Sequence, residues 1–210
     1  MDAVVVETGL GNVRSVEKAL ETAAREQGLA AARIARSADP DRIRRADRLI
    51  VPGQGGFGEG ARALSGELGE VLRERLSAGV PYLGICLGLQ LLFEASEEAE
   101  GRGLGWFRGA VRALQPAPGI KIPHMGWNQL ELSGGGHPCL EAAGGQGAWV
   151  YFVHSYHAVP ADPDVLKAAC SFGPNRVTAA VARDNVLATQ FHPEKSQQAG
   201  LRLLGAFLRG

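Results

Sequence analysis

The 210-residue sequence predicts a doubly wound α/β fold: a mostly parallel sheet with helices on both faces and an antiparallel extension in the second half. In the first half, short apolar runs alternate with helical patterns, as in parallel sheets with crossover helices. The first run, Val4 to Val6, has no polar interruption, which is typical of a strand buried on both faces. From 106 to 191, short strand-like runs are separated by Gly and Pro turns. No linker or repeat divides the chain, so we expect one domain over 1–210.

The first expected strand is Val4 to Val6. A helix should follow from about Asn12 to Gln27, because its apolar residues form one stripe and Gly28 supplies a C-terminal stop. A weaker strand covers 31–36. Asp39-Pro40 then opens a short helix, with an N-cap followed by a proline at the first helical position.

The next strand, 48–51, ends at the loop Pro52-Gly53-Gln54-Gly55-Gly56, and a helix from near 59 to 76 should follow it. Residues 81–85 form the strand that delivers Cys86, with a helix continuing to about 95. The last helix, about 197–209, carries leucines on one face. In such sheets the chemistry gathers at the carboxyl ends of the strands, where both Cys86 and the 52–56 loop lie.

Charge and composition exclude several function classes. Lys plus Arg equals Asp plus Glu at 22 each, so we expect neither a nucleic-acid partner nor an anionic membrane surface. The N-terminus lacks a signal-peptide pattern, and no apolar stretch approaches the roughly 20 residues that span a bilayer. Three cysteines without CxxC spacing favour a reducing compartment. These features predict a cytoplasmic protein.

Cys86 is the candidate nucleophile. It stands between Gly84 and Gly88 at a strand-to-helix junction, where glycines permit a sharp turn that exposes the side chain. A thiol attacks only as thiolate, and a helix N-terminus together with a nearby imidazolium would favour that form.

His192 and Glu194 supply the base and the group that orients it. They flank Pro193 after a second apolar run, and the rigid proline fixes how the two side chains project. The oxyanion formed on attack needs backbone N–H donors, and the candidates are Leu87 and the loop of Gly53, Gln54 and Gly55. Each motif alone is usually structural, whereas their joint occurrence in the correct strand and helix context favours catalysis.

Two motifs resemble the active-site signatures of class I glutamine amidotransferases. They are Gly84-Ile85-Cys86-Leu87-Gly88-Leu89-Gln90 and Gln190-Phe191-His192-Pro193-Glu194-Lys195-Ser196. Two further runs are similar to one branch of that family, the glutaminase subunits of imidazole glycerol phosphate synthase. These are Lys121-Ile122-Pro123-His124-Met125-Gly126-Trp127-Asn128 and Tyr151-Phe152-Val153-His154-Ser155-Tyr156.

The resemblance implies hydrolysis of glutamine to glutamate and ammonia through a thioester on Cys86. By the family pattern, the glutamine would be held by Gln90, Glu98, His154, Ser155 and Tyr156, with Glu98 receiving its α-ammonium. It also implies a heterodimer in histidine biosynthesis, in which a (β/α)₈-barrel cyclase receives the ammonia and makes imidazole glycerol phosphate and an aminoimidazole carboxamide ribotide. The interface residues would be Met125, Trp127 and Asn128.

The chain departs from the family pattern at Glu7-Thr8-Gly9, where Asp-Tyr-Gly is usual, and at Gln54, which replaces a small aliphatic residue. Two alternatives stay open: a glutaminase that serves another acceptor, and a non-catalytic regulatory scaffold. No cofactor is expected. We expect no metal site, because the histidines match no zinc spacing.

Overall fold

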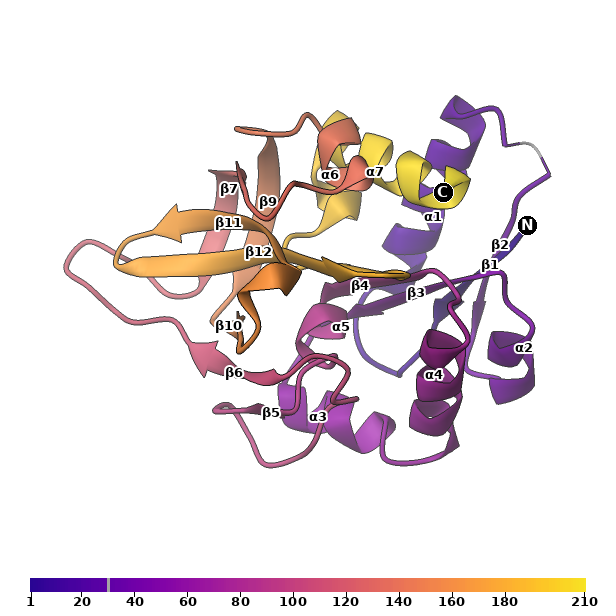
Figure 1. The fold of residues 1–210 in the computed structure, drawn as a ribbon, viewed down its shortest axis with the longest axis horizontal. Coiled ribbons are helices and arrows are strands. Elements are labelled where there is room, and N and C mark those ends of the chain that lie inside the picture. The colour runs from indigo at the N-terminus through magenta and orange to yellow at the C-terminus, as the bar shows by residue number, and fades with distance from the viewer. Residues whose placement is uncertain (30) are drawn as a thin grey trace.

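An eight-stranded sheet forms the centre of the protein in a computed structural model, which describes residues 1–29 and 31–210 (Figure 1). In spatial order its strands are β2 (Arg33–Ser37), β1 (Asp2–Val6), β3 (Arg48–Gly53), β4 (Tyr82–Cys86), β13 (Val186–Thr189), β12 (Asn175–Arg183), β11 (Leu166–Phe172) and β8 (Glu131–Leu132). The strands from β2 to β13 run parallel, and β12, β11 and β8 continue the sheet antiparallel. The predicted parallel sheet and its antiparallel extension are confirmed.

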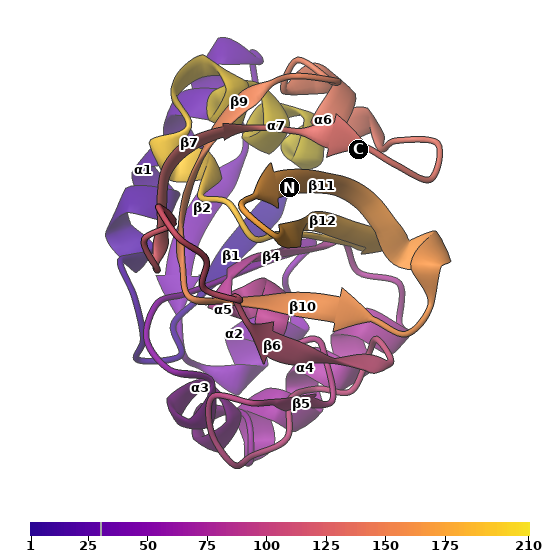
Figure 2. The ribbon, with the colours of Figure 1, turned by 90° about the vertical axis from the view of Figure 1, so that its left-hand side faces the viewer.

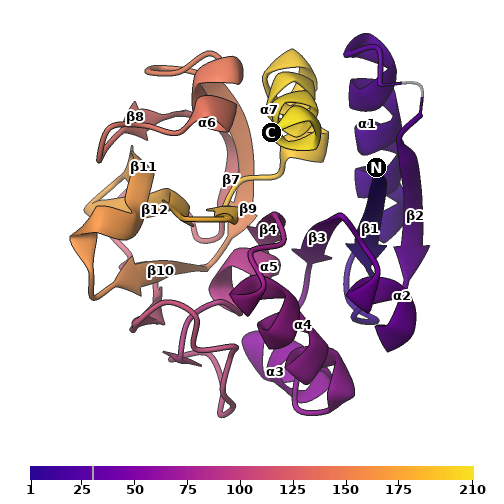
Figure 3. The same cartoon turned by 45° about the vertical axis from the view of Figure 1, so that its right-hand side comes forward.

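Helices cover both faces of this sheet (Figures 1 and 3). One face carries α1 (Val13–Glu26), α6 (Pro138–Ala142) and α7 (Gln197–Arg209). The other carries α2 (Pro40–Arg44), α3 (Phe57–Ala63), α4 (Glu67–Ser77) and α5 (Leu87–Gln90).

Strand β1 shows why this arrangement follows from the sequence. Successive side chains of a strand point to opposite faces. Ala3 and Val5 therefore enter the core beneath α1 and α7, whereas Val4 and Val6 enter the core beneath α2 and α4. All four are fully buried, so an unbroken apolar run is what this position requires.

Two smaller sheets flank the carboxyl ends of the central strands (Figure 2). One contains β10 (Tyr156–Pro160), β6 (Gly109–Ala113) and β5 (Ala95–Ser96), and the other pairs β7 (His124–Gln129) with β9 (Trp149–His154). Two short 3₁₀ turns, η1 (Pro163–Val165) and η2 (Pro193–Lys195), complete the elements.

The single helix expected over 59–76 is wrong. The chain forms α3 and α4 instead, because Gly66 adopts extended backbone (φ −111°, ψ −156°) and starts a new helix. The break is tight: a Cβ on Gly69 would lie 2.0 Å from the Leu64 carbonyl oxygen. A glycine is therefore needed in the first turn of α4.

The helix expected from Cys86 to about 95 is also wrong, since α5 ends at Gln90. Leu91 and Leu92 direct their carbonyl oxygens to partners far along the chain. These are the backbone N–H groups of Leu104 and Phe107, at 2.7 and 3.0 Å. Tertiary hydrogen bonds therefore take the acceptors that a longer helix would use internally.

None of the helices among residues 1–29 and 31–210 is long and apolar enough to cross a membrane. Cys86, Cys139 and Cys170 are all buried free thiols.

Gly88→Ala should lower the free energy of unfolding by about 3 kcal/mol, near the upper end of overpacking costs. The reason is that a Cβ on Gly88 would lie 1.8 Å from the carbonyl oxygen of Val51 in β3. Urea unfolding of the purified variant measures the loss. Gly66→Ala is the control, because its Cβ would meet no atom within 4 Å. As an N-cap change it should cost about 1 kcal/mol at most. Equal losses in the two variants would contradict the steric argument.

Candidate active site

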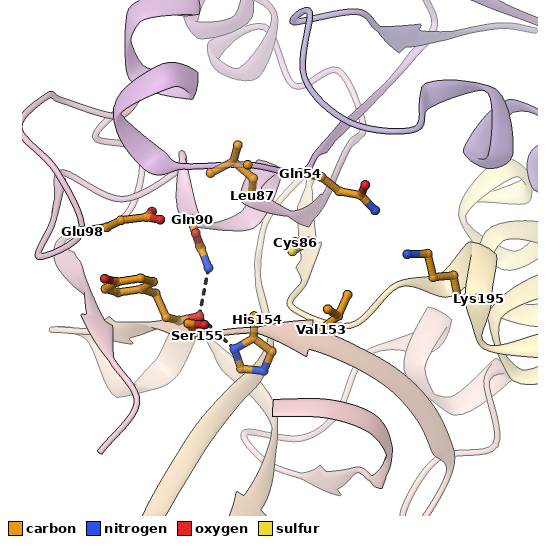
Figure 4. Close-up of a pocket in the computed structure, with 11 residues that line it drawn as sticks. Gln54, Cys86, Leu87, Gln90, Glu98, Val153, His154, Ser155 and Lys195 are labelled. Carbon is orange, nitrogen blue, oxygen red and sulfur yellow. Dashed lines mark hydrogen bonds between the residues drawn. The ribbon is translucent and has the colours of Figure 1, made fainter. Parts of the chain in front are cut away.

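Cys86 lies at the junction between β4 and α5 with a left-handed backbone, φ 55° and ψ −105°. This conformation costs a non-glycine residue about 1–3 kcal/mol and is kept where the surroundings enforce it. Two close approaches do so here. A Cβ on Gly84 would lie 2.7 Å from the Gly88 carbonyl oxygen, and Gly88 itself lies against β3. The turn projects the thiol into a surface pocket, where 8% of the residue is exposed (Figure 4).

His192 and Glu194 form a buried pair just beyond β13. The imidazole Nδ1 lies 2.7 Å from Glu194 Oε1, and both side chains are almost fully buried. The His192 backbone is held by its N–H, which donates to the Tyr151 carbonyl oxygen, and by its carbonyl, which accepts from Ser196 Oγ. The carboxylate keeps Nδ1 protonated, so Nε2 is the atom left for chemistry. It has no hydrogen-bond partner within the described part of the chain.

The electrostatics of this pair favour imidazolium. Burial alone would lower the pKa of His192, but its interactions with Cys86 and Glu194 raise that pKa to about 9. At neutral pH the histidine is therefore protonated and can stabilise a thiolate at Cys86.

The 53–55 loop lies directly beside the nucleophile. Gly53 is the β3 partner of Cys86 in the parallel register, and Gln54 and Gly55 line the pocket. Gly55 has a φ of +109°, which glycine adopts readily. Leu87, as the first residue of α5, has a backbone N–H without an intrahelical acceptor. The candidate oxyanion donors are thus gathered around one sulfur atom.

The pocket in front of Cys86 has a volume of about 380 Å³, which suits a small-molecule ligand. Nine of the residues singled out from the sequence line it: Gln54, Gly55, Cys86, Leu87, Gln90, Glu98, His154, Ser155 and Tyr156. Val153 and Lys195 also line it and were missed by the sequence analysis (Figure 4). Lys195 directly follows Glu194, so its place in the motif was the available signal.

Glu98 has a structural partner as well as a place in the pocket. Its Oε2 accepts the backbone N–H of Phe57 at 2.7 Å and thereby caps α3. A carboxylate has capacity for further donors through its other oxygen. Capping one helix is therefore compatible with contact to an ammonium group in the pocket.

Gln90 and His154 both hydrogen-bond to the backbone carbonyl oxygen of Tyr156. The Tyr156 carbonyl oxygen lies 3.0 Å from Gln90 Nε2 and 2.9 Å from His154 Nδ1 (Figure 4). Gln90 Nε2 also donates to Gln190 Oε1 at 3.2 Å. Gln190 is fully buried and was assigned no role from the sequence. The side of the pocket opposite the 53–55 loop is therefore a connected polar network.

The three residues expected at a partner interface lie on β7, and their side chains point in two directions. Met125 and Trp127 are 62% and 43% exposed, and Trp149 on the adjacent β9 is 55% exposed. The Asn128 amide instead donates inward to the Ser171 carbonyl oxygen. Exposed apolar side chains on one small sheet are typical of an interaction surface.

Within the described residues, no group of three or more His, Cys, Asp or Glu side chains could hold a metal ion.

Comparison with known proteins gives the family. The sequence profile described as glutamine amidotransferase class-I matches residues 3–209. The chain belongs to the class-I glutamine amidotransferases. The predicted family and the enzyme class are thereby confirmed.

Within this family, several full-length relatives carry one name, imidazole glycerol phosphate synthase subunit HisH. The relative from Rhodospirillum rubrum is 48% identical and covers 100% of this chain and 99% of its own. The relative from Thermosynechococcus vestitus is 45% identical and covers 97% and 94%, respectively. The relative from Mesorhizobium japonicum is 44% identical and covers 100% and 99%.

Solved structures agree on the fold. The chain resembles a structure titled PurLQS from Thermotoga maritima with a TM-score of 0.73 and 21% identity, over 99% of this chain and 97% of that one. A second structure, titled glutamine amidotransferase, gives a TM-score of 0.68 at 22% identity, over 98% and 97%. These likenesses establish the amidotransferase fold.

Two buried histidines extend the polar network of this amidotransferase away from the pocket. His124 Nδ1 lies 3.0 Å from His154 Nε2, and the His124 ring stacks between Phe152 and Phe172. Burial lowers the pKa of His124 to about 4. Burial, together with the neighbouring histidines, lowers the pKa of His154 to about 3. Both rings are therefore neutral at physiological pH.

This pair should make stability fall on acidification from pH 6.5 to about 4. In that window the unfolded chain protonates both histidines whereas the folded chain does not, so the free energy of unfolding rises with pH by about 1.4 kcal/mol per unit for each proton. His124→Phe keeps the ring stacking with Phe152 and removes one titrating group. Urea unfolding between pH 5 and 6.5 measures how the free energy of unfolding changes with pH. In His124→Phe this slope should be smaller than in the unaltered chain by the contribution of about one proton.

Phe152→Leu is the control for that experiment. It disturbs the same aromatic stack without removing a proton-binding group. The pH slope of its free energy of unfolding should therefore equal that of the unaltered chain. An unchanged slope in His124→Phe would show that His124 titrates alike in the folded and unfolded states.

Proposed function

We propose that this chain is the glutaminase subunit of imidazole glycerol phosphate synthase and works in the cytoplasm as one amidotransferase domain over residues 1–210. The observation that carries the proposal is the convergence of three features. The Cys86 thiol at its turn faces a pocket of about 380 Å³ and interacts with His192, whose Nδ1 lies 2.7 Å from Glu194 Oε1. The third feature is the similarity to the HisH relatives, whose name specifies imidazole glycerol phosphate synthase.

The first half of the reaction makes the thioester. The pKa of His192 is raised to about 9, so an imidazolium stands ready to stabilise Cys86 in the thiolate form that attacks. The Cys86 thiolate attacks the side-chain amide carbon of glutamine, and the amide oxygen becomes an oxyanion. Backbone N–H groups of Leu87 and of the 53–55 loop stabilise that charge, and one such donor contributes about 10²–10³ in rate. His192 then gives its proton to the departing nitrogen, which leaves as ammonia.

The second half restores the enzyme. His192, now neutral, takes a proton from water, and the resulting hydroxide attacks the thioester carbonyl. Collapse of this intermediate returns Cys86 as thiolate beside imidazolium and gives the side-chain carboxylic acid, which loses its proton to solvent and leaves as glutamate. Glu194 keeps Nδ1 protonated throughout, so the same Nε2 serves both proton transfers.

The rest of the pocket fixes the substrate. Glu98 receives the α-ammonium through the oxygen that does not cap α3, and Gln90 and the His154-Ser155-Tyr156 run bind the remaining polar groups. Lys195, a cation at the pocket rim, suits the α-carboxylate by charge.

The ammonia passes to a (β/α)₈-barrel cyclase that forms a heterodimer with this chain. Met125 and Trp127 anchor that partner, because they are exposed apolar side chains on β7. The paired strand β9 carries Val153, which lines the pocket. An interface on this sheet covers the approach to Cys86 and so shelters the ammonia from bulk water.

Glutamate release from glutamine should be weak for the chain alone and strongly activated by the cyclase with its nucleotide substrate. Cys86→Ala should abolish glutamine-dependent synthesis of imidazole glycerol phosphate in the complex, because the nucleophile is lost. It should retain synthesis from ammonium salts, because the acceptor chemistry lies on the cyclase. Coupled assays of glutamate and imidazole glycerol phosphate measure both.

The other outcomes separate the alternatives. Full glutaminase activity that is indifferent to the cyclase would keep the enzyme and discard the pathway. No glutamate under any condition would leave a non-catalytic scaffold. Loss of ammonium-dependent synthesis in an intact Cys86→Ala complex would overturn the division of labour.

Trp127→Ala should weaken association with the cyclase by at least about tenfold, since a partly exposed Trp on an interface often dominates binding. The free energy of unfolding should change far less, because 43% of Trp127 is already exposed. Titration calorimetry measures the dissociation constant. Val159→Ala on β10 is the matched control: Val159 is 44% exposed but lies on the other small sheet. An unchanged dissociation constant in Trp127→Ala would remove this surface from the interface.

A further inference from the structure

The parallel register of β4 and β13 brings a buried amide beside the nucleophile. Ile85 pairs with Thr189, so the next residues on the two strands, Cys86 and Gln190, emerge side by side. Gln190 Nε2 lies 3.5 Å from Cys86 Sγ, within hydrogen-bond reach of a sulfur atom. The Gln190 backbone is anchored as well, because its N–H donates to the Ala179 carbonyl oxygen at 2.8 Å. Gln190 is therefore fixed against the sulfur from its own strand end.

The direction of the Gln190 amide follows from its neighbours. The Tyr156 carbonyl oxygen can only accept, so the group of Gln90 that faces it at 3.0 Å is the NH₂. The same NH₂ faces Gln190 at 3.2 Å, and the Gln190 atom there must be the carbonyl oxygen. The remaining end of the Gln190 amide is its NH₂, and this end faces Cys86. The sulfur thus meets a donor.

The same reasoning gives the tautomers of His154 and His124, at the end of the network away from Cys86. His154 Nδ1 donates to the Tyr156 oxygen, so the Nε2 of the neutral ring accepts from His124 Nδ1. His124 Nε2 then accepts from the Asn128 NH₂ at 3.3 Å. The lowered pKa values of both rings keep these tautomers in place at physiological pH. The Gln90 and Gln190 amides therefore rest on a network in which each proton has one position.

A donor at this point has a chemical effect on the sulfur. A hydrogen bond to the charged form of a group favours that form, and a thiolate accepts more strongly than a thiol. An amide cannot itself ionise, so it does not compete with His192 for the reacting protons. It also limits the rotation of the sulfur about the Cα–Cβ bond of Cys86, which places the attacking atom.

We propose that Gln190 is a positioning residue: its side-chain NH₂ donates to Cys86 Sγ, fixes the sulfur in the pocket and favours the thiolate. This inference rests on the proposed glutaminase function of Cys86. In this proposal Gln190 acts on the sulfur rather than on the substrate, since it is fully buried and does not line the pocket.

Alkylation of Cys86 by iodoacetamide as a function of pH tests the proposal directly. In Gln190→Met, which keeps the length but lacks the donor, the pH of half-maximal alkylation should rise by about one unit or more, because a hydrogen bond to a charged group is lost. In Gln190→Glu the shift should be larger, because a carboxylate repels the thiolate. Gln115→Met is the matched control, since Gln115 is exposed and its side chain donates only to the Ala113 carbonyl oxygen among the described residues.

The other two thiols do not confuse the measurement. Burial raises the pKa of Cys139 to about 11 and that of Cys170 to about 12, so both stay protonated over the useful range. Cys86→Ala gives the background to subtract. Circular dichroism and thermal unfolding establish that each variant is folded, and Gln190→Glu carries the test if Gln190→Met does not fold.

Glutaminase kinetics in the complex with the cyclase provide the second readout. Loss of positioning should lower kcat for glutamine by about tenfold or more and leave KM within about twofold, because Gln190 does not touch the substrate. An unchanged alkylation profile in a folded variant would overturn the proposal, as would a raised KM with unchanged kcat.

Failure of the proposed function is recognised separately. In that case the unaltered chain releases no glutamate with the cyclase, and glutamine does not protect Cys86 from alkylation. The alkylation profiles of the Gln190 variants still show whether the amide acts on the sulfur.

Discussion

The reversal of the chain at Cys86 is the constraint on which the rest of the site depends. A left-handed backbone at a non-glycine residue is unfavourable, so it persists only because β3, β4 and α5 meet with no room to relax. The missing Cβ atoms of Gly84 and Gly88 allow that contact. The turn brings the thiol to the pocket at the carboxyl edge of the sheet. The strain and the reactivity of this residue therefore have one structural cause.

The same edge explains why residues distant in the sequence meet at one sulfur atom. Strands β3, β4 and β13 are parallel neighbours, so Gly53, Cys86 and Gln190 emerge in one row. His192 follows Gln190 by two residues. The oxyanion loop, the nucleophile, its amide neighbour and its base are thus supplied by three adjacent strand ends. Parallel pairing, rather than any local motif, sets their mutual spacing.

Much of this could be predicted from the sequence, for identifiable reasons. The apolar run at Val4 to Val6 requires burial on both faces, and the Gly-Ile-Cys-Leu-Gly pattern encodes the turn around Cys86. The short α5 could not be predicted, because it ends where Leu104 and Phe107 take the carbonyl groups of Leu91 and Leu92. That outcome depends on contacts made by residues more than ten positions away. Local pattern carries no information about them, and tertiary hydrogen bonds prevail over helix propensity.

Gln190 shows a different limit of sequence reasoning. Its residue type and its place before His192 were visible, but its role depends on which end of the amide faces the sulfur. That orientation is decided by the Tyr156 carbonyl oxygen, 34 residues earlier in the chain, through Gln90. Because a carbonyl oxygen cannot donate, one backbone acceptor fixes two side-chain amides and two imidazole tautomers. A single unalterable acceptor thus gives the network its polarity, from Asn128 on β7 through to the thiol. Reversing the Gln190 amide would set donor against donor, and reversing the Gln90 amide would set acceptor against acceptor, so both amides keep one orientation.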